Sequence, residues 1–185
     1  ESSLDTAYAG DTVLLQGNLR ADVTEALCET CKSRNLYLVL NPSPFDTAFR
    51  DLVSLADALF VNETEARGLT GKSREAAVEA LLGLGARQIV LTLGQEGALL
   101  GTPDSTLRIP AVSVDVVDVT GAGDCFEGVA VGSAMVRDTQ IDAVALSHAS
   151  RAAAHTISGF GTTESFPSHG QIAAFMSDRV NFDRR

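Results

Sequence analysis

The sequence predicts an α/β fold built on a mostly parallel central sheet. Three observations lead to this prediction. Strand-like and helix-like segments alternate through the first half of the chain, and the strand-like segments are nearly continuous apolar runs. The middle segment of the chain is rich in strand-forming residues and is interrupted by glycines. The segments that follow have the composition of helices. Continuous apolar strands that alternate with helices are typical of a parallel sheet covered on both faces. We therefore expect three layers, with the sheet between two layers of helices.

Four buried strands are predicted before the middle of the chain. Each is a short run rich in Val, Leu, Ile or Phe that ends at turn-forming or polar residues. They are expected at residues 12–16, 36–40, 58–61 and 88–93.

Helices are expected between these strands and after the β-rich middle. Asp22 and Glu25 have the spacing of a capping box, which places the first helix start at Asp22. The later helices are expected near 47–55, after 62–65, from Lys72 or Ser73, and at about 122–137, 140–157 and 168–179.

A hairpin-like insertion is expected in the middle of the chain. Gly94-Gln95-Glu96-Gly97 predicts a tight turn into residues 98–101, and residues 106–109 and 112–117 are expected to be strands. No repeat or linker interrupts the sequence, so it predicts one domain over residues 1–185.

Composition excludes several classes of protein. The 24 Asp and Glu against 14 Lys and Arg give a net charge of -10, which disfavours a nucleic-acid partner. No apolar run approaches the roughly 20 residues of a membrane span, and no signal peptide is visible. Three cysteines do not suggest a disulfide framework, so a cytoplasmic protein is expected. Cys28 and Cys31 are interpreted as structural residues of a helix.

Two common nucleotide motifs are absent. Gly71-Lys72-Ser73 resembles the end of a P-loop, but Ala66 stands where the pattern needs glycine. After Gly121 and Gly123, the third glycine of a Rossmann fingerprint falls at Phe126.

Residues 120–124 predict an anion-binding helix start. Thr120 is a suitable N-cap, and Gly121, Ala122 and Gly123 leave the first-turn N–H groups unshielded at the positive end of the helix dipole. Asp124 could take a proton from a nucleophile that attacks a phosphoryl group held there. It could equally stabilise its own helix, with glycines for close packing. The pattern alone leaves both interpretations open.

The surrounding motifs resemble the ribokinase-like, phosphofructokinase B type carbohydrate kinases. Residues 118–124 resemble the family signature Asp-Thr-x-Gly-Ala-Gly-Asp, with Val119 at its variable second position. Residues 41–44, 62–65 and 92–97 are similar, in the same order, to the Asn-Pro-Ala-Pro, Asn-x-x-Glu and Thr-Leu-Gly-x-x-Gly motifs. The resemblance implies a ribokinase-like fold and an ATP-dependent kinase for a sugar or sugar-like alcohol.

The resemblance also implies roles for individual residues. Asp124 would be the catalytic base, and the N–H groups of residues 121–124 the anion hole for the γ-phosphoryl group. Asn62 would contact ATP phosphates, and Glu65 would organise Mg²⁺ through water. The adenine pocket would be lined by Thr92, Leu93, Gly94, Gln95, Glu96, Gly97 and His148. A monovalent cation such as K⁺ would be surrounded by Asp118, Thr120, Thr156, Gly159, Gly161 and Ser165.

Simpler interpretations stand beside these roles. Asn62 could be an N-cap with Glu65 as its first-turn charge, and residues 92–94 could be a strand end. His148 could be a structural histidine, which is how His155 and His169 are interpreted.

The resemblance covers only the C-terminal part of family members. Their N-terminal part and lid, which grip the sugar, have no counterpart, and Asn18 stands where ribokinases tend to carry Glu. We therefore expect the chain to expose an edge of its sheet, and to associate either with itself or with a partner chain. A monodisperse monomer in light scattering would count against this.

Two other functions remain open. A non-catalytic nucleotide-binding module would bind ATP without transferring phosphate to any sugar or nucleoside. A nucleoside, pseudouridine or hydroxymethylpyrimidine kinase of the same fold would share the motifs quoted above.

Overall fold

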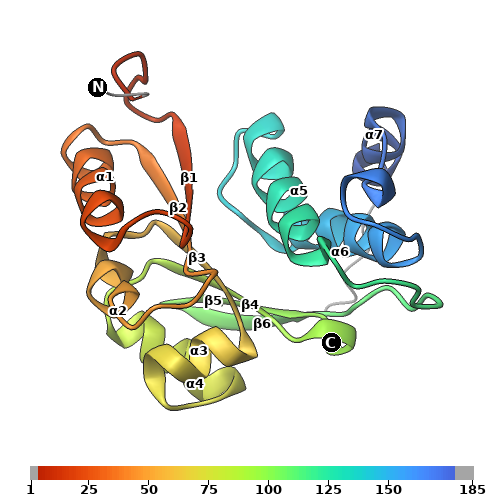
Figure 1. Ribbon diagram of the computed structural model, residues 1–185, viewed down its shortest axis with the longest axis horizontal. Coiled ribbons are helices and arrows are strands. Elements are labelled where there is room, and N and C mark those ends of the chain that lie inside the picture. Colours follow the sequence, from red (N-terminus) through yellow and green to blue (C-terminus); the bar gives the residue numbers. More distant parts are fainter. Residues whose placement is uncertain (1–3, 178–185) are drawn as a thin grey trace. The chain divides into compact units, whose positions relative to one another are not determined.

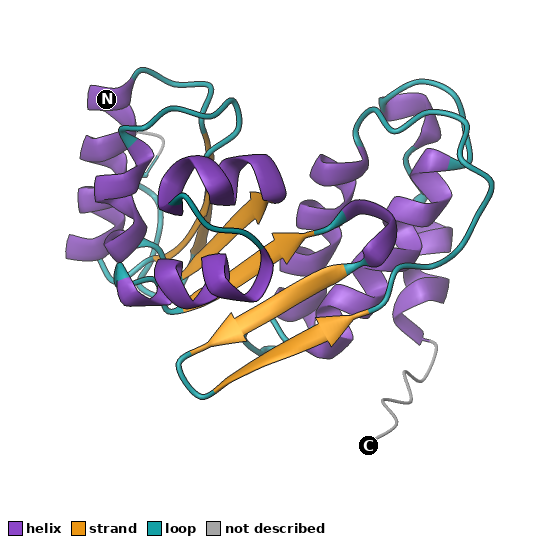
Figure 2. Cartoon of the chain, turned by 90° about the horizontal axis from the view of Figure 1, so that it is seen from below, coloured by secondary structure: helices purple, strands orange, loops and turns teal. Residues whose placement is uncertain are grey.

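The computed structural model describes residues 4–177 of the chain. In this part a six-stranded sheet has its strands in sequence order. The first four strands are parallel (Figure 1), whereas Figure 2 shows β5 and β6 running in opposite directions as a hairpin. The strands are β1 (Thr12–Gln16), β2 (Tyr37–Asn41), β3 (Ala58–Asn62), β4 (Gln88–Thr92), β5 (Ala98–Thr102) and β6 (Ser105–Ile109). The predicted α/β class and hairpin are confirmed.

The chain divides into two compact units. The first comprises Glu1–Leu93 and Leu99–Leu107, and the second comprises Gly94–Ala98 and Arg108–Arg185. Each unit is described by itself below, and the single domain over residues 1–185 stays a prediction.

The first unit holds the parallel strands and their connecting helices. Crossovers between parallel strands are right-handed, so a sheet in sequence order receives its connecting helices on one face. Figure 1 shows α1 to α4 along these strands. The helical segments are α1 (Ala21–Ser33), α2 (Phe49–Leu52), η1 (Val53–Leu55), α3 (Glu63–Thr70) and α4 (Arg74–Gly83).

Alternate strand residues build the core of the first unit. Leu40, Leu59 and Leu91 lie in one hydrophobic cluster with residues of the connecting helices. Their neighbours Val39, Phe60 and Val90, on the other face of the sheet, are also buried. Burial on both faces explains why these strands read as continuous apolar runs.

The second unit is mostly helical. α5 (Ala122–Val136) and α6 (Ala143–Ile157) pack against each other, and α7 (His169–Ser177) follows. Short 3₁₀ segments are η2 (Gly94–Glu96) and η3 (Thr163–Ser165). Small buried residues, among them Ala130, Ala145 and Ala149, allow the backbones of α5 and α6 to approach closely.

Three local predictions are wrong, of which the third, the Thr120 cap, is described with the functional site. Residues 112–117 form no strand: Val116 and Val117 are exposed, and the Val117 N–H donates to the Ile157 carbonyl at 2.8 Å. β-branched composition favours a strand only where a partner strand is available. Asp22 caps no helix, because α1 begins after Arg20, whose guanidinium binds the Asp22 carboxylate at 2.8 and 3.0 Å.

The cysteine interpretation agrees with the structure. Cys28 and Cys31 are fully buried on α1. Burial raises the pKa of the Cys28 thiol to about 12, which disfavours the thiolate at neutral pH.

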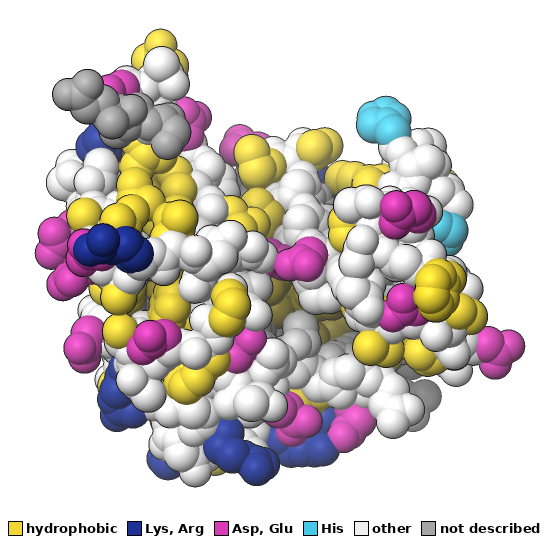
Figure 3. Space-filling view, viewed as in Figure 1, with side chains coloured by type: hydrophobic (Ala, Val, Ile, Leu, Met, Phe, Trp, Pro, Cys, Tyr) yellow, Lys and Arg dark blue, Asp and Glu magenta, His cyan; other side chains and the backbone are white. Residues whose placement is uncertain are grey.

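Apolar side chains are exposed around β1, the first strand at the edge of the sheet. Figure 3 shows hydrophobic side chains gathered where Figure 1 draws β1 and α1, and Leu14, Leu19 and Val23 are about two-fifths exposed. The expected self-association stays a prediction. Within residues 4–177, no helix has the length and apolar character needed to cross a bilayer.

Candidate functional site

Polar side chains line the carboxyl edge of the parallel strands in the first unit. Gln16 ends β1 opposite Asn41 of β2, and Asn62 ends β3 opposite Thr92 of β4. Open α/β sheets bind ligands at this edge. The sequence motifs selected Asn62 and Thr92, but Gln16 was missed. Its position directly after an apolar run was the available signal.

Asn62 and Glu65 form a reciprocal capping box at the start of α3. The Asn62 side-chain oxygen accepts from the Glu65 N–H at 2.9 Å, and the Glu65 carboxylate accepts from the Asn62 N–H at 2.8 Å. Burial raises the pKa of Glu65. Hydrogen bonds from the Asn62 N–H and the Ser43 hydroxyl lower this pKa, but their effect is smaller than that of burial. Both residues therefore have a structural role, and their roles toward ATP and Mg²⁺ stay predictions.

Replacing Asn62 separates its structural role from a role in binding. Asn62→Ala should lose about 1 kcal/mol of unfolding free energy because the cap is removed, whereas Asn62→Ser should keep most of it. If the amide also contacts phosphate, both variants should bind Mg·ATP more weakly. Urea unfolding and titration calorimetry measure the two effects. Wild-type ATP affinity in Asn62→Ser would show that Asn62 is only a cap.

Residues 92–97 adopt the expected tight turn. The Thr92 hydroxyl donates to the Val61 carbonyl at 3.4 Å, and Leu93 is buried. The Gly97 N–H donates to the Gly94 carbonyl at 3.0 Å, with Gly97 in the left-handed region at φ 91°. Gln95 and Glu96 lie between them in η2. The turn is confirmed, and its contact with adenine stays a prediction.

The start of α5 differs from the predicted cap. Gly121 is the N-cap at φ 78°, and no side chain caps the helix. The Thr120 N–H and hydroxyl instead donate to Asp118 Oδ1, at 3.0 and 2.7 Å. The Ala122 N–H donates to the Val119 carbonyl at 3.2 Å. The first turn thus has no side-chain cap, but the Ala122 N–H is engaged by the backbone.

The two glycines of this turn have different surroundings. A Cβ on Gly121 would lie 2.8 Å from the Phe166 ring, so close packing and the left-handed φ explain this glycine. A Cβ on Gly123 would meet no atom within 4 Å. Packing therefore accounts for Gly121 but not for Gly123, whose surface is open next to the exposed Asp124.

Asp118 joins the loop before α5 to the loop after α6. Its Oδ2 accepts from the Gly161 N–H at 3.2 Å, while Oδ1 accepts from Thr120. These hydrogen bonds lower the pKa of Asp118 and keep its carboxylate ionised. The hydrogen bonds from Thr120 have the largest effect. The structure thus brings Asp118, Thr120 and Gly161 together, and their role toward a cation stays a prediction.

The remaining residues of the predicted cation site lie at and after the end of α6. The Ser165 hydroxyl lies 2.7 Å from the Gly161 carbonyl oxygen, and Gly159 packs against Ser165. Thr156 is fully buried, its hydroxyl donating to Ala152, and its carbonyl accepts from the Gly159 N–H at 3.2 Å. No group of three His, Cys, Asp or Glu side chains suited to a metal occurs in the described part of the chain.

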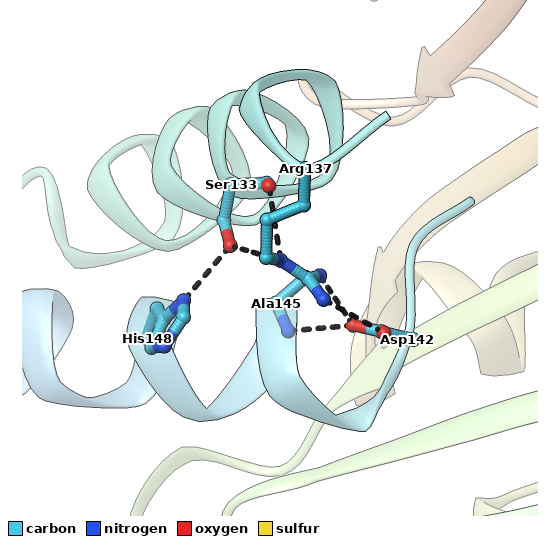
Figure 4. Close-up of polar contacts among 5 residues, drawn as sticks. All are labelled: Ser133, Arg137, Asp142, Ala145 and His148. Carbon is cyan, nitrogen blue, oxygen red and sulfur yellow. Dashed lines mark hydrogen bonds and ion pairs between the residues drawn. The ribbon is translucent and has the colours of Figure 1, made fainter. Parts of the chain in front are cut away.

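His148 is held in a polar chain between α5 and α6 (Figure 4). It is 1% exposed, and its Nδ1 lies 2.8 Å from the Ser133 Oγ. Arg137 Nε contacts the carbonyl and hydroxyl oxygens of Ser133, at 3.2 and 3.4 Å. Its two terminal nitrogens bind the carboxylate of Asp142, the N-cap of α6, at 2.6 and 3.0 Å. Sequence reasoning selected His148 but missed the other members of this chain.

The fold and site together define an α/β protein in which α5 begins at Gly121 without a side-chain cap. The model of the pfkB family of carbohydrate kinases matches residues 4–169, and the chain therefore belongs to this family.

Relatives and a solved structure agree with this assignment. The chain is 29% identical to ribokinase of Bacillus subtilis strain 168 over 176 residues, and 33% identical to deoxyribokinase of Salmonella typhi over 175 residues. These matches cover 95% and 89% of the chain. Arabidopsis thaliana ribokinase, solved with ribose and ATP, has a TM-score of 0.81 at 27% identity and covers 91% of the chain. The fold is therefore ribokinase-like.

The chain matches only part of each of these proteins. It spans 58% of the Bacillus ribokinase, 56% of the Salmonella deoxyribokinase and 56% of the Arabidopsis chain. The activity and substrate of the whole protein are therefore treated as proposals.

Proposed function

We propose that the chain carries the nucleotide-binding and phosphoryl-transfer part of an ATP-dependent sugar kinase. The observation that carries this proposal is the arrangement of residues 118–124. In a chain of the pfkB family, the open Gly123 and the exposed Asp124 occupy the uncapped first turn of α5. This arrangement supplies N–H donors for an anion next to a carboxylate able to accept a proton.

The proposed reaction is an in-line transfer. A sugar hydroxyl oxygen attacks the γ-phosphorus of ATP, its proton passes to Asp124, and the bond between γ-phosphorus and the bridging oxygen breaks to release ADP. Backbone N–H groups of the first turn of α5 stabilise the charge on the transferring phosphoryl oxygens. The engaged Ala122 N–H leaves Gly123 as the centre of this anion hole.

The other implied groups fit the residues present. Mg²⁺ takes hard oxygen ligands and keeps several waters, and Glu65 offers a carboxylate oriented by its capping box. When bound, Mg²⁺ would neutralise charge on the ATP phosphates that Asn62 would contact. A K⁺ ion would take oxygens from the loops joined by Asp118. The turn at residues 92–97 and His148 would bind adenine.

Sugars are the proposed acceptors. Support comes from the family match and from relatives named ribokinase and deoxyribokinase. Transfer of radiolabelled phosphate from ATP to a panel of pentoses, hexoses and nucleosides tests this proposal. A sugar product supports it, and a product formed only from nucleosides identifies the related nucleoside kinase. ATP binding without any product would instead indicate a non-catalytic module.

Gly123→Ala should separate catalysis from folding. The added methyl meets no atom in the folded chain, and alanine favours a helix by about 0.5–1 kcal/mol, so stability should not fall. Phosphoryl transfer should fall roughly a hundredfold, because the methyl crowds the anion hole. Gly128→Ala is the matched control, since it also lies on α5 with open space and should leave activity unchanged. Equal activity of the two variants would contradict the assigned anion hole.

A further inference from the structure

The motif of residues 41–44 has no role in the reaction proposed above. It begins at Asn41, the last residue of β2, on the carboxyl edge of the sheet. The loop that it opens contacts two other elements of the first unit, namely the end of β1 and the start of α3. These contacts indicate what the motif does.

The loop packs on the residue that follows β1. The Gly17 N–H donates to the Ser43 carbonyl at 3.0 Å. A Cβ on Gly17 would lie 2.4 Å from the Pro44 carbonyl oxygen, so the two backbone segments are in direct contact. The backbone of Ser43 is therefore held at a fixed place beside the end of β1.

The loop also contacts the first turns of α3. The Ser43 hydroxyl donates to the Glu65 carboxylate. Three positions further along the helix, a Cβ on Gly68 would lie 2.5 Å from the ring of Phe45. Residues three apart lie on the same face of a helix, so the loop joins the end of β1 to one face of α3.

The Glu65 carboxylate thus accepts hydrogen bonds from two separate segments. Its Oε2 accepts from the Asn62 N–H at 2.8 Å, and the Ser43 hydroxyl approaches from the loop after β2. Glu65 is only 6% exposed, and a carboxylate accepts stronger hydrogen bonds than a neutral oxygen does. Because the two donors are fixed by different parts of the backbone, together they hold the carboxylate in one orientation.

We propose that Ser43 is a positioning residue that fixes the orientation of the Glu65 carboxylate for Mg²⁺-dependent nucleotide binding. The metal part of this inference rests on the proposed function, which assigns Glu65 to Mg²⁺. Groups that orient a carboxylate near a metal strengthen metal binding. Residues 41–44 differ from Asn-Pro-Ala-Pro only at Ser43, and alanine has no side-chain donor. The contact with Glu65 therefore belongs to this chain and not to the motif.

Amide hydrogen exchange of the Asn62 N–H tests the orientation of Glu65 without any ligand. This N–H donates to the Glu65 carboxylate, so it exchanges faster when the carboxylate turns away. Ser43→Ala should raise its exchange rate roughly three- to tenfold relative to that of the buried Val90 N–H, the range expected for one hydrogen bond. Ser43→Thr, which keeps the hydroxyl, should restore the wild-type ratio.

Calorimetric titration with a non-hydrolysable ATP analogue, once with Mg²⁺ and once with EDTA, tests the link to the metal. Ser43→Ala should bind the analogue roughly tenfold more weakly with Mg²⁺, and with unchanged affinity in EDTA. Ser43→Thr should bind like the wild type under both conditions. Ser113→Ala is the matched control, because Ser113 is also exposed but lies in the second unit, and it should change neither affinity.

The two experiments separate the possible failures. An unchanged Asn62 exchange ratio in Ser43→Ala overturns the proposal. Equal weakening with Mg²⁺ and with EDTA, or no weakening at all, overturns the link between Ser43 and Mg²⁺. A wild-type chain that binds no nucleotide contradicts the kinase proposal instead, and the exchange experiment still decides whether Ser43 positions Glu65.

Discussion

Asp124→Asn is expected to lower phosphoryl transfer by two to four orders of magnitude while ATP binding survives. General-base catalysis contributes about this much, and the amide of asparagine cannot accept the proton of the sugar hydroxyl at neutral pH. ATP affinity should hold or rise slightly, because the variant removes a negative charge beside the phosphates. The exposed position of Asp124 in the first turn of α5 makes a large loss of stability unexpected.

The measurement is steady-state sugar phosphorylation by the protein as its gene encodes it, together with calorimetry of Mg·ATP binding. Asp115→Asn is the matched control. Asp115 is also exposed in the second unit, and its replacement by Asn removes the same negative charge. Near-normal turnover of Asp124→Asn would refute its assignment as the base.

Gly97→Ala should cause the largest loss of stability, about 3 kcal/mol or more. Its Cβ would lie 2.0 Å from the Ile109 carbonyl oxygen and 2.7 Å from the Ala111 nitrogen. Both are backbone atoms, so no side-chain rotation relieves the clash. The left-handed φ of 91° adds strain.

Urea unfolding of Gly94→Ala provides the matched comparison. Gly94 is also left-handed, at φ 58°, but its Cβ would meet no atom within 4 Å. It should therefore lose only the roughly 1–2 kcal/mol cost of a left-handed alanine. If Gly97→Ala unfolds at the same urea concentration as Gly94→Ala, the close approach of the backbone at Gly97 is refuted.

The strands were predictable because the signal is local. β3 and β4 are apolar runs bounded by turns. Because both faces of these strands are buried, apolar and polar residues do not alternate along them, and each strand appears in the sequence as one continuous apolar run. Residues 112–117 carry the same β-branched signal but find no partner strand. Pairing is a tertiary property, which composition alone does not contain. Asp22 and Thr120 failed as caps for a related reason, because the nearby Arg20 and Asp118 engage their side chains.

The candidate site was predictable where short motifs carry it. The N-cap at Asn62 and the turn of residues 92–97 form as their sequences indicate. The pattern could not show that Gly121 packs against Phe166 while Gly123 stays open. It also could not show the contact of Ser133 with His148, because residues 15 positions apart meet only after α5 and α6 pack together.

An amide NMR titration of the chain with Mg²⁺ and a non-hydrolysable ATP analogue tests the central claim most directly. The proposed site predicts saturable shifts at residues 121–124, 62–65 and 92–97, with weaker binding in Gly123→Ala and little change in Gly128→Ala. An absence of saturable shifts at these residues, or shifts confined to other surfaces, would contradict the assignment of this chain to nucleotide binding and phosphoryl transfer.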